Sequence, residues 1–396
     1  MDSYGRYACE SVLGDLSMVY LDYAASAPMD TFLAYDIPDR VIRYYGNPSS
    51  MHQQGVKANK LINDSKRMIA EIINCEPEEI YFTSGGTESD NWALRGIVKP
   101  GDHIITTAIE HSAVLETCKY LETKGVEVTY VKPDKDGRVA LKDVIAAKRD
   151  NTKLLSIMYV NNETGVVQHI KSIAEWAKSE GIIVHTDAVQ AVGKLLINLK
   201  ELDVDLLSAS AHKFGGLKGT GFLYVRKGTE IAPLIFGGGQ QNGMRSGTED
   251  AVGAYFMAVS LVAFHNKTLA LALTTEKTLR HLVNSLFGIS GVYANSYIHT
   301  NIVNVYIEGV DAESLVTAMS EMGYYISAGS ACHSGDKKPS HVLKAMGYSD
   351  ERCNQSIRIS IGYETTVPEI DEFIEMLKVN INLLRQGKAN EENEHV

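Results

Sequence analysis

The chain has 396 residues, of which 44% are hydrophobic and 22% charged, a composition typical of globular proteins with room for one large and one smaller domain. The formal net charge of −11 argues against a surface that coats nucleic acid. No apolar run reaches about 18 residues, so no membrane span is predicted. Residues 1–17 lack the basic-then-apolar pattern of a secretory signal.

The cysteines are odd in number and widely spaced along the chain. They are Cys9, Cys75, Cys118, Cys332 and Cys353. Because no two of them form a C-x-x-C pair, neither a zinc ribbon nor a disulfide framework is predicted, and no metal site is expected. A reducing, cytoplasmic location fits this pattern best, with at least one thiol available for chemistry.

The first two thirds of the chain alternate between short apolar runs and helical segments. A short strand over residues 19–21 leads into a small-residue turn, and residues 58–73 show the apolar spacing of an amphipathic helix. Strands are then predicted over residues 80–83, 103–106, 126–131, 154–160, 182–185 and 206–208, with helices over 112–124 and 170–179. This alternation predicts an α/β fold with a mostly parallel sheet covered by helices on both faces.

The last third of the chain has a different pattern. A Gly-rich loop over residues 236–248 precedes a helix-forming stretch over 251–287. Strands at 302–307 and 356–361, a helix at 311–322, a loop at 324–340 and a closing helix at 368–384 predict a smaller α+β domain. The expected organisation is an N-terminal extension (1–18), a large domain (19–264), a small domain (265–385) and a polar tail (386–396).

Polar side chains follow the strands of the predicted parallel sheet. Thr87, His111, Asn162, Asp187 and Lys213 each come just after a strand. In open α/β sheets ligands bind outside the carboxyl ends of the strands. These five side chains are therefore predicted to meet at one edge of one sheet.

Lys213 follows an apolar strand and small residues, and Gly215 and Gly216 come after it. Burial disfavours an ammonium ion, so a lysine at this place has a lowered pKa and offers a nucleophilic amine. A lysine whose amine lies in solvent is the better interpretation of this segment taken alone. The surrounding motifs decide between the two.

Three further motifs each have a structural and a functional interpretation. Residues 84–87 (Ser-Gly-Gly-Thr) form either an anion site at a helix start or an ordinary glycine turn, and they match neither a P-loop nor G-x-G-x-x-G. Asp187 either pairs with a protonated ring nitrogen or caps a helix, and His111 either stacks on a flat ring or lies in the core. A lysine, an acid for a ring nitrogen and a phosphate site together describe pyridoxal phosphate (PLP) chemistry.

Two residues of the last third are also candidates. Cys332 lies among small residues in the segment 328–335, which favours a mobile thiol over the buried cysteine that is the usual alternative. Arg358 lies in the apolar strand 356–361, where a guanidinium binds either a substrate carboxylate or a structural acid.

The chain resembles the class V group of fold-type I PLP enzymes, and within it the NifS/IscS-type cysteine desulfurases, from about residue 19 to residue 384. The resemblance rests on ten segments, at residues 20–25, 47–52, 83–91, 110–111, 160–163, 185–190, 210–213, 244–248, 329–332 and 357–360. It implies the fold-type I architecture, PLP as cofactor and L-cysteine as substrate.

The resemblance also implies a role for each candidate residue. Lys213 would hold PLP as a Schiff base, His111 would stack on the ring and move protons, and Asp187 would pair with the ring nitrogen. Gln190 would contact the ring oxygen, and Asn162 the cofactor or the substrate carboxylate. Arg358 would bind that carboxylate, and Cys332 would accept the sulfur as a persulfide, leaving alanine. The phosphate would be held by Gly86, Thr87, Ser210 and His212, with Thr248 from the other subunit of a homodimer.

The resemblance implies a sulfur-acceptor protein, in iron–sulfur cluster assembly or thiolation, whose identity the sequence leaves open. The alternatives are a selenocysteine lyase, another class V enzyme such as an aminotransferase, and a sulfur-relay partner without catalysis. An aminotransferase would not need Cys332. The presence of Lys213, Asp187 and Cys332 argues against the non-enzymatic alternative.

Overall fold

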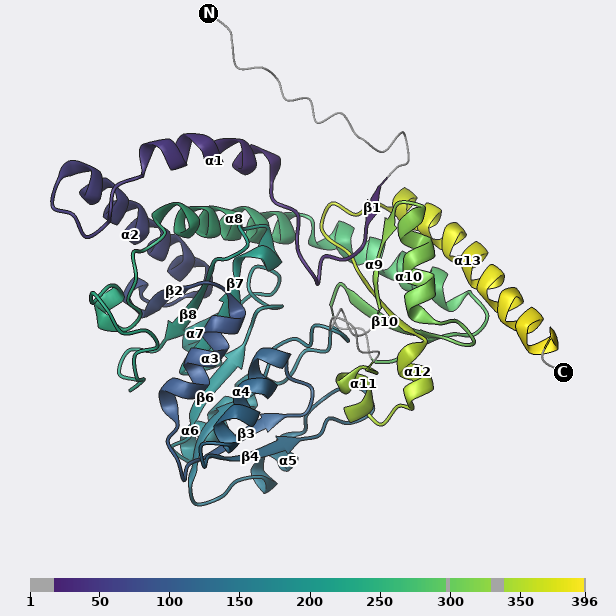
Figure 1. The fold of residues 1–396 in the computed structure, drawn as a ribbon, viewed down its shortest axis with the longest axis horizontal. Helices are drawn as coiled ribbons and strands as arrows, with labels where there is room; N and C mark the ends of the chain where they lie inside the picture. Colours follow the sequence, from purple (N-terminus) through teal and green to yellow (C-terminus); the bar gives the residue numbers. More distant parts are fainter. Residues whose placement is uncertain (1–17, 297–299, 329–337, 395–396) are drawn as a thin grey trace, which may run out of the picture.

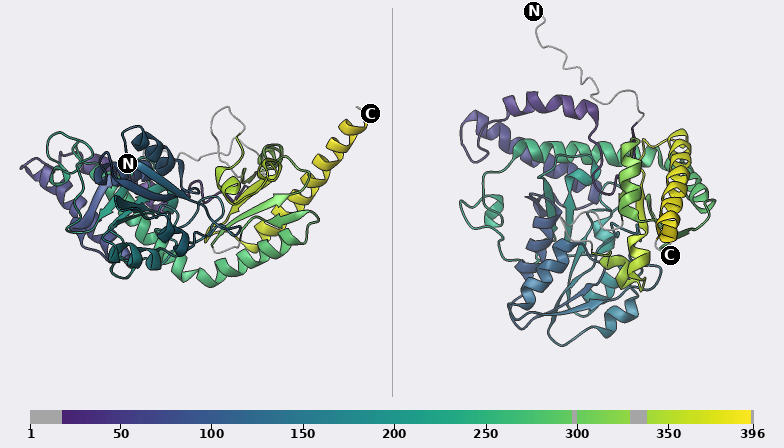
Figure 2. Two further views of the ribbon diagram at one scale, coloured as in Figure 1. Left: turned by 90° about the horizontal axis from the view of Figure 1, so that it is seen from below. Right: turned by 45° about the vertical axis from the view of Figure 1, so that its right-hand side comes forward.

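The computed structural model describes residues 18–296, 300–328 and 338–394, and the side chains up to residue 387. Its strands form a seven-stranded sheet and a four-stranded sheet in two separate lobes, which α8 (Ala251–Ala270) and α9 (Ala272–Phe287) connect (Figures 1 and 2). The predicted domain boundary near Phe264 falls within α8 and stays a prediction.

The seven-stranded sheet is mostly parallel, as predicted. Its spatial order is β2-β8-β7-β6-β5-β3-β4, and only β8 runs antiparallel to its neighbours. The strands are β2 (Ile80–Thr83), β3 (His103–Thr107), β4 (Glu127–Val131), β5 (Thr152–Ser156), β6 (Ile183–Asp187), β7 (Leu206–Ser210) and β8 (Gly221–Val225). The strand predicted over 154–160 ends at Ser156, which leaves residues 157–162 as an irregular segment beside the sheet.

Helices cover both faces of this sheet because consecutive strand residues point to opposite sides. Ile105 packs with the core that contains α2, α5, α6, α7 and α8, whereas its neighbour Ile104 packs with α3 and α4. The helices are α1 (Thr31–Arg43), α2 (Gln53–Ile73), α3 (Gly86–Ile97), α4 (Ser112–Glu122), α5 (Leu141–Ala146), α6 (Ile170–Ser179) and α7 (Leu199–Leu202). This arrangement confirms the predicted fold class.

The four-stranded sheet is antiparallel, in the order β12-β13-β10-β9. Its strands are β9 (Val292–Ala294), β10 (Ile302–Ile307), β12 (Ser327–Ala328) and β13 (Ser356–Ser360), and α10 (Ala312–Glu321), α11 (His341–Ala345), α12 (Asp350–Asn354) and α13 (Val367–Glu394) belong to the same lobe. The short strand β1 (Val19–Tyr20) pairs with β11 (Tyr324–Tyr325), so Val19 and Leu21, predicted as part of the large domain, pack in this second core.

The helical stretch predicted over 251–287 is two helices, because α8 ends at Ala270 and α9 continues at an angle of 71°. Among the described residues, no single helix has the length and apolar character to cross a membrane. Taken together, the bent pair α8 and α9 passes that test by length and composition.

Candidate active site

A cavity of about 690 Å³ lies at the carboxyl ends of the parallel strands and reaches the second sheet. Of the residues predicted for the site, it is lined by Gly86, Thr87, His111, Asn162, Asp187, Gln190, Ser210, His212, Lys213 and Arg358. The side chains at the strand ends therefore line one cavity, as predicted. The functional role of each stays a prediction.

Lys213 lies in a 3-10 turn (Ala211–Phe214) that begins where β7 ends. Gly215 ends the turn with a φ of +78°, and a Cβ there would lie 2.7 Å from the Pro28 oxygen, so only glycine fits without a shift. The Lys213 Nζ atom donates hydrogen bonds to the carbonyl oxygens of Ala24 (2.8 Å) and Ala25 (2.9 Å). Both partners are neutral acceptors, which leaves the amine available for chemistry.

The pKa of Lys213 is lowered to about 8, mainly by burial and secondly by the positive charge of Arg358. Asp187 and Asp22 act in the opposite direction. The lowered pKa increases the fraction of this amine that is neutral near physiological pH, as a nucleophile requires. The interpretation as a lysine in solvent does not fit this environment.

Asp187 is the last residue of β6 and only 5% exposed. Its Oδ1 accepts a hydrogen bond from the Val189 amide (2.9 Å). Burial raises the pKa of this carboxyl, whereas His111 and Lys213 lower it. A buried carboxylate is costly without a cationic partner, so a ligand with a protonated ring nitrogen would stabilise it here.

The start of α3 offers backbone amides to an anion. Gly85 precedes the helix and has no side chain that could cap it. The first backbone amides of the helix therefore receive no side-chain cap at this position. A Cβ on Gly86 would lie 2.7 Å from a methyl carbon of Val189, so a larger residue would require the Val189 side chain to move. Thr87, Ser210 and His212 line the same cavity. Hydroxyl, imidazole and amide donors are the chemistry that holds a phosphate group.

His111 precedes α4 and caps it, because its Nδ1 accepts a hydrogen bond from the Ala113 amide (3.1 Å). A neutral ring that accepts at Nδ1 carries its proton on Nε2. The predicted helix start is thus correct, and the same histidine also lines the cavity.

Arg358 reaches the cavity from β13 and is 3% exposed. Its Nη2 atom donates to Asp22 Oδ1 (2.8 Å) and Ser327 Oγ (3.1 Å), and its Nη1 atom donates to the main-chain carbonyl oxygen of Asn162 (2.9 Å). The Nε atom is buried without a hydrogen-bond partner among the described residues. The structural interpretation is found, since Arg358 binds Asp22, and the binding of a substrate carboxylate by Arg358 stays a prediction.

Several buried or half-buried ionisable groups around the cavity were not predicted. Burial raises the pKa of Glu110 to about 8 and that of Glu163 to about 7, and it lowers the pKa of Lys194 to about 7. Asp90 has a pKa well above its usual value through burial and the nearby Asp187. The segment 83–91 contains Asp90, but its sequence gives no sign that this carboxyl faces the sheet.

Two predicted residues are not among the described residues that line the cavity. Cys332 lies outside the described residues. Thr248 is exposed and does not line the cavity of its own chain. The chain reaches the cavity on one side of Cys332 with Lys338 and Pro339, and on the other side Ala328 pairs with Ile357, next to Arg358.

The model for the family "Aminotransferase class-V" matches residues 19–373. The chain belongs to the aminotransferase class-V family. It is 41% identical over 389 residues to "Cysteine desulfurase IscS" of Methanosarcina thermophila, with 95% of each chain covered. The resemblance stated from the motifs is thereby confirmed over nearly the whole chain.

Solved structures show the same fold. One described as "NIFS-LIKE PROTEIN" has a TM-score of 0.87 at 35% identity and covers 93% of this chain and 100% of its own. Another, "SspA in complex with cysteine", has a TM-score of 0.77 at 35% identity and covers 87% of this chain and 99% of its own. Both support the architecture of a fold-type I PLP enzyme.

Class-V enzymes depend on PLP, so the predicted cofactor is confirmed for the family. The cavity fits this group because it combines an amine of lowered pKa, a buried carboxylate and an uncapped helix start. In this chain Lys213, Asp187 and the residues around Gly86 are those that would hold it.

Proposed function

We propose that the protein is a PLP-dependent cysteine desulfurase, which converts L-cysteine to L-alanine and transfers the sulfur to Cys332. The observation that carries this proposal is one cavity lined by Lys213, Asp187 and Arg358. These are an amine for the cofactor, an acid for its ring and a guanidinium for an amino-acid carboxylate. The cysteine desulfurase relatives support the same activity.

Each side chain acts on the substrate or its cofactor in a defined way. PLP supplies a carbonyl that condenses with amines and a ring that accepts electrons. Arg358 binds the carboxylate of L-cysteine and so fixes its Cα in the cavity. Lys213 and His111 are the groups placed to take a proton from Cα and to return one.

Sulfur transfer requires a thiolate that attacks the substrate sulfur. The bond between carbon and sulfur breaks, a sulfur–sulfur bond forms on Cys332, and the carbon takes a proton to become the methyl group of alanine. The described cysteines are poorly suited to this step, because burial raises the pKa of Cys75, Cys118 and Cys353. The small-residue segment around Cys332 supports a thiol that moves between substrate and acceptor.

A product assay tests the function. Purified protein loaded with PLP and given L-cysteine and a thiol reductant is expected to release alanine and sulfide in equal amounts. Release of pyruvate with ammonia, or of a keto acid without sulfide, would contradict the proposal and favour another class V reaction. Selenocysteine in the same assay separates a desulfurase from a selenocysteine lyase by the ratio of the two rates.

Arg358→Gln tests carboxylate binding. The variant is expected to raise the KM for L-cysteine by about 10- to 100-fold, since the positive charge and a charge-assisted hydrogen bond to the carboxylate are lost. Steady-state kinetics measures this, with Arg280→Gln, an exposed helix arginine, as the control. An unchanged KM in a folded variant that still binds PLP would remove Arg358 from the substrate site.

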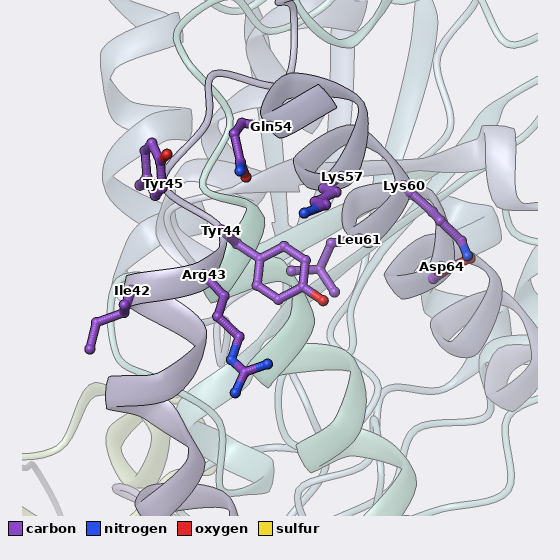
Figure 3. A pocket seen from close by; sticks show the side chains of 9 residues that line it. All are labelled: Ile42, Arg43, Tyr44, Tyr45, Gln54, Lys57, Lys60, Leu61 and Asp64. Carbon is purple, nitrogen blue, oxygen red and sulfur yellow. The ribbon is translucent and has the colours of Figure 1, made fainter. Parts of the chain in front are cut away.

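We also propose that the enzyme is a homodimer. Large apolar side chains are exposed on α1, on α2 and between them, among them Phe32, Ile42, Tyr45, Met51 and Val56. A cavity of about 530 Å³ lies in the same region. Ile42, Tyr45 and Lys57 are among the residues that line it (Figure 3). An apolar surface of this kind supports contact with a second copy of the chain.

Thr248 would reach the phosphate site of the partner subunit, in keeping with its exposed position outside its own cavity. Thr248→Ala is expected to weaken PLP binding by about tenfold, the effect of one lost hydrogen bond to a charged group. Mixed dimers of Thr248→Ala with Lys213→Ala subunits decide the geometry by PLP titration. One site of wild-type affinity per mixed dimer is expected, and none would contradict a contribution across the interface.

The sulfur acceptor and the location complete the proposal. The persulfide on Cys332 would pass to a protein of iron–sulfur cluster assembly or thiolation, as the resemblance to IscS-type enzymes supports. A cytoplasmic location fits free thiols, because an oxidising compartment would convert them to disulfides.

A further inference from the structure

Lys194 contacts Gln190, a residue that lines the cavity and is only 4% exposed. The Lys194 Nζ atom donates a hydrogen bond to the Gln190 Oε1 atom (2.7 Å). The Gln190 Nε2 atom donates to the Ala24 oxygen (2.8 Å), which also accepts from Lys213 Nζ (2.8 Å). A continuous chain of hydrogen bonds thus joins Lys194 to the catalytic amine.

The chemistry of these groups fixes the orientation of the Gln190 amide. A protonated lysine amine has three donors and no acceptor, so it holds the amide oxygen on its own side. The Nε2 group then lies on the cavity side, where one of its two hydrogens is used by Ala24. The second hydrogen remains for an acceptor on a ligand in the cavity.

We propose that Lys194 is a positioning residue, which acts through Gln190 to present an N–H donor to the ring oxygen of the cofactor. The inference rests on the proposed function, since it assigns that oxygen to PLP. Without Lys194 only the Ala24 oxygen holds the Gln190 amide in this orientation, so the amide rotates by half a turn more readily and then presents its own oxygen. Two oxygens would then face each other, and the anionic form of the ring oxygen would be destabilised.

The charges around Lys194 are consistent with this role. Burial, followed by the positive charges of Lys213 and Arg358, lowers its pKa to about 7. His212, whose pKa is lowered in part by Lys194, is the further titratable group that faces this cluster. The anionic groups of the bound cofactor reduce the repulsion among these cations and favour the charged form of Lys194.

Lys194→Met tests the proposal in the PLP-loaded enzyme by a spectroscopic pH titration. The visible absorption of PLP proteins changes as the lysine nitrogen that holds the cofactor loses its proton. Donation to the ring oxygen favours the deprotonated form, because it stabilises the anionic ring oxygen that remains after the proton is lost. Loss of Lys194 is therefore expected to raise the midpoint of this titration by about one pH unit.

Three companion variants make the result specific. Lys194→Arg keeps a donor and a charge and should leave the midpoint near that of wild type, and so should Lys200→Met at an exposed lysine. In a Gln190→Met background, Lys194→Met should add little further shift, because the two residues act as one unit. If Lys194→Met fails to fold, the same comparison is made with Lys194→Gln.

The outcomes separate this inference from the proposed function. A wild-type protein without visible absorption would overturn the function itself. A coloured wild type with the same midpoint in folded Lys194→Met would overturn only the role of Lys194. An equal shift in both the wild-type and the Gln190→Met background would show a charge effect that does not act through Gln190, and would also overturn the inference.

Discussion

Lys213→Ala is expected to yield a folded protein without visible absorption, whose rate of sulfide release from L-cysteine is lower by about 10⁴-fold. The physical reason is that this variant loses the only amine in the described cavity that has a pKa of about 8 and follows directly after β7. The variant lacks both the covalent bond to the cofactor and a group that transfers the Cα proton. Absorption spectroscopy and a sulfide assay measure the two effects.

Lys218→Ala serves as the matched control, because this exposed lysine lies five positions further along the chain and does not line the cavity. It should keep the colour and the activity of wild type. If Lys213→Ala retained a PLP spectrum that borohydride reduction fixes to the protein, another lysine would hold the cofactor and the site described above would be misassigned.

Cys332→Ser is the second substitution with a large expected effect. It should reduce sulfide release by about 10³-fold or more, because an alcohol at this position is a far weaker nucleophile than a thiolate. The absorption spectrum of the bound cofactor should stay that of wild type, and L-cysteine should still change it. The comparison of spectrum and activity separates substrate binding from sulfur transfer.

Cys75→Ser is the control for this variant. Burial raises the pKa of the Cys75 thiol, so little thiolate forms there near neutral pH and the variant should remain active. Full sulfide release by Cys332→Ser would show that the sulfur leaves the substrate without Cys332, which would remove this residue from its role.

The strand-end residues of the cavity could be predicted because position in a parallel sheet determines where a side chain lies. His111 and Asp187 come at the ends of β3 and β6 in the sequence, and both line the cavity. The local pattern was sufficient for them. The resemblance then gave each residue a role that spacing alone left open.

Other features depend on contacts that are remote in sequence. Lys194 is four residues from Gln190, but Gln190 bonds to Ala24, which lies 166 positions away. Asp22 holds Arg358 across 336 positions. No local pattern encodes such pairs, so the positioning role of Lys194 and the ion pair of Asp22 had no signal in the sequence.

The unpredicted elements have physical reasons of their own. Helix α1 contains Pro38, a residue that usually interrupts a helix, so its segment was not predicted to be helical, and none of its residues is buried. The bend after Ala270 occurs without Pro or Gly nearby, so the sequence pattern indicated one continuous helical stretch. Strand β8 follows a glycine-rich stretch and is antiparallel to β7. Among the described residues, no α-helix separates these two strands, so β8 does not fit the alternation of strand and helix on which the prediction was based.

The most direct test of the account is the mass of the peptide that contains Cys332 after incubation of the PLP-loaded enzyme with L-cysteine in the absence of reductant. The account predicts one extra sulfur atom on this peptide and one alanine formed for each sulfur bound. Alanine formation without sulfur on Cys332, or sulfur bound to another cysteine in its place, would contradict it.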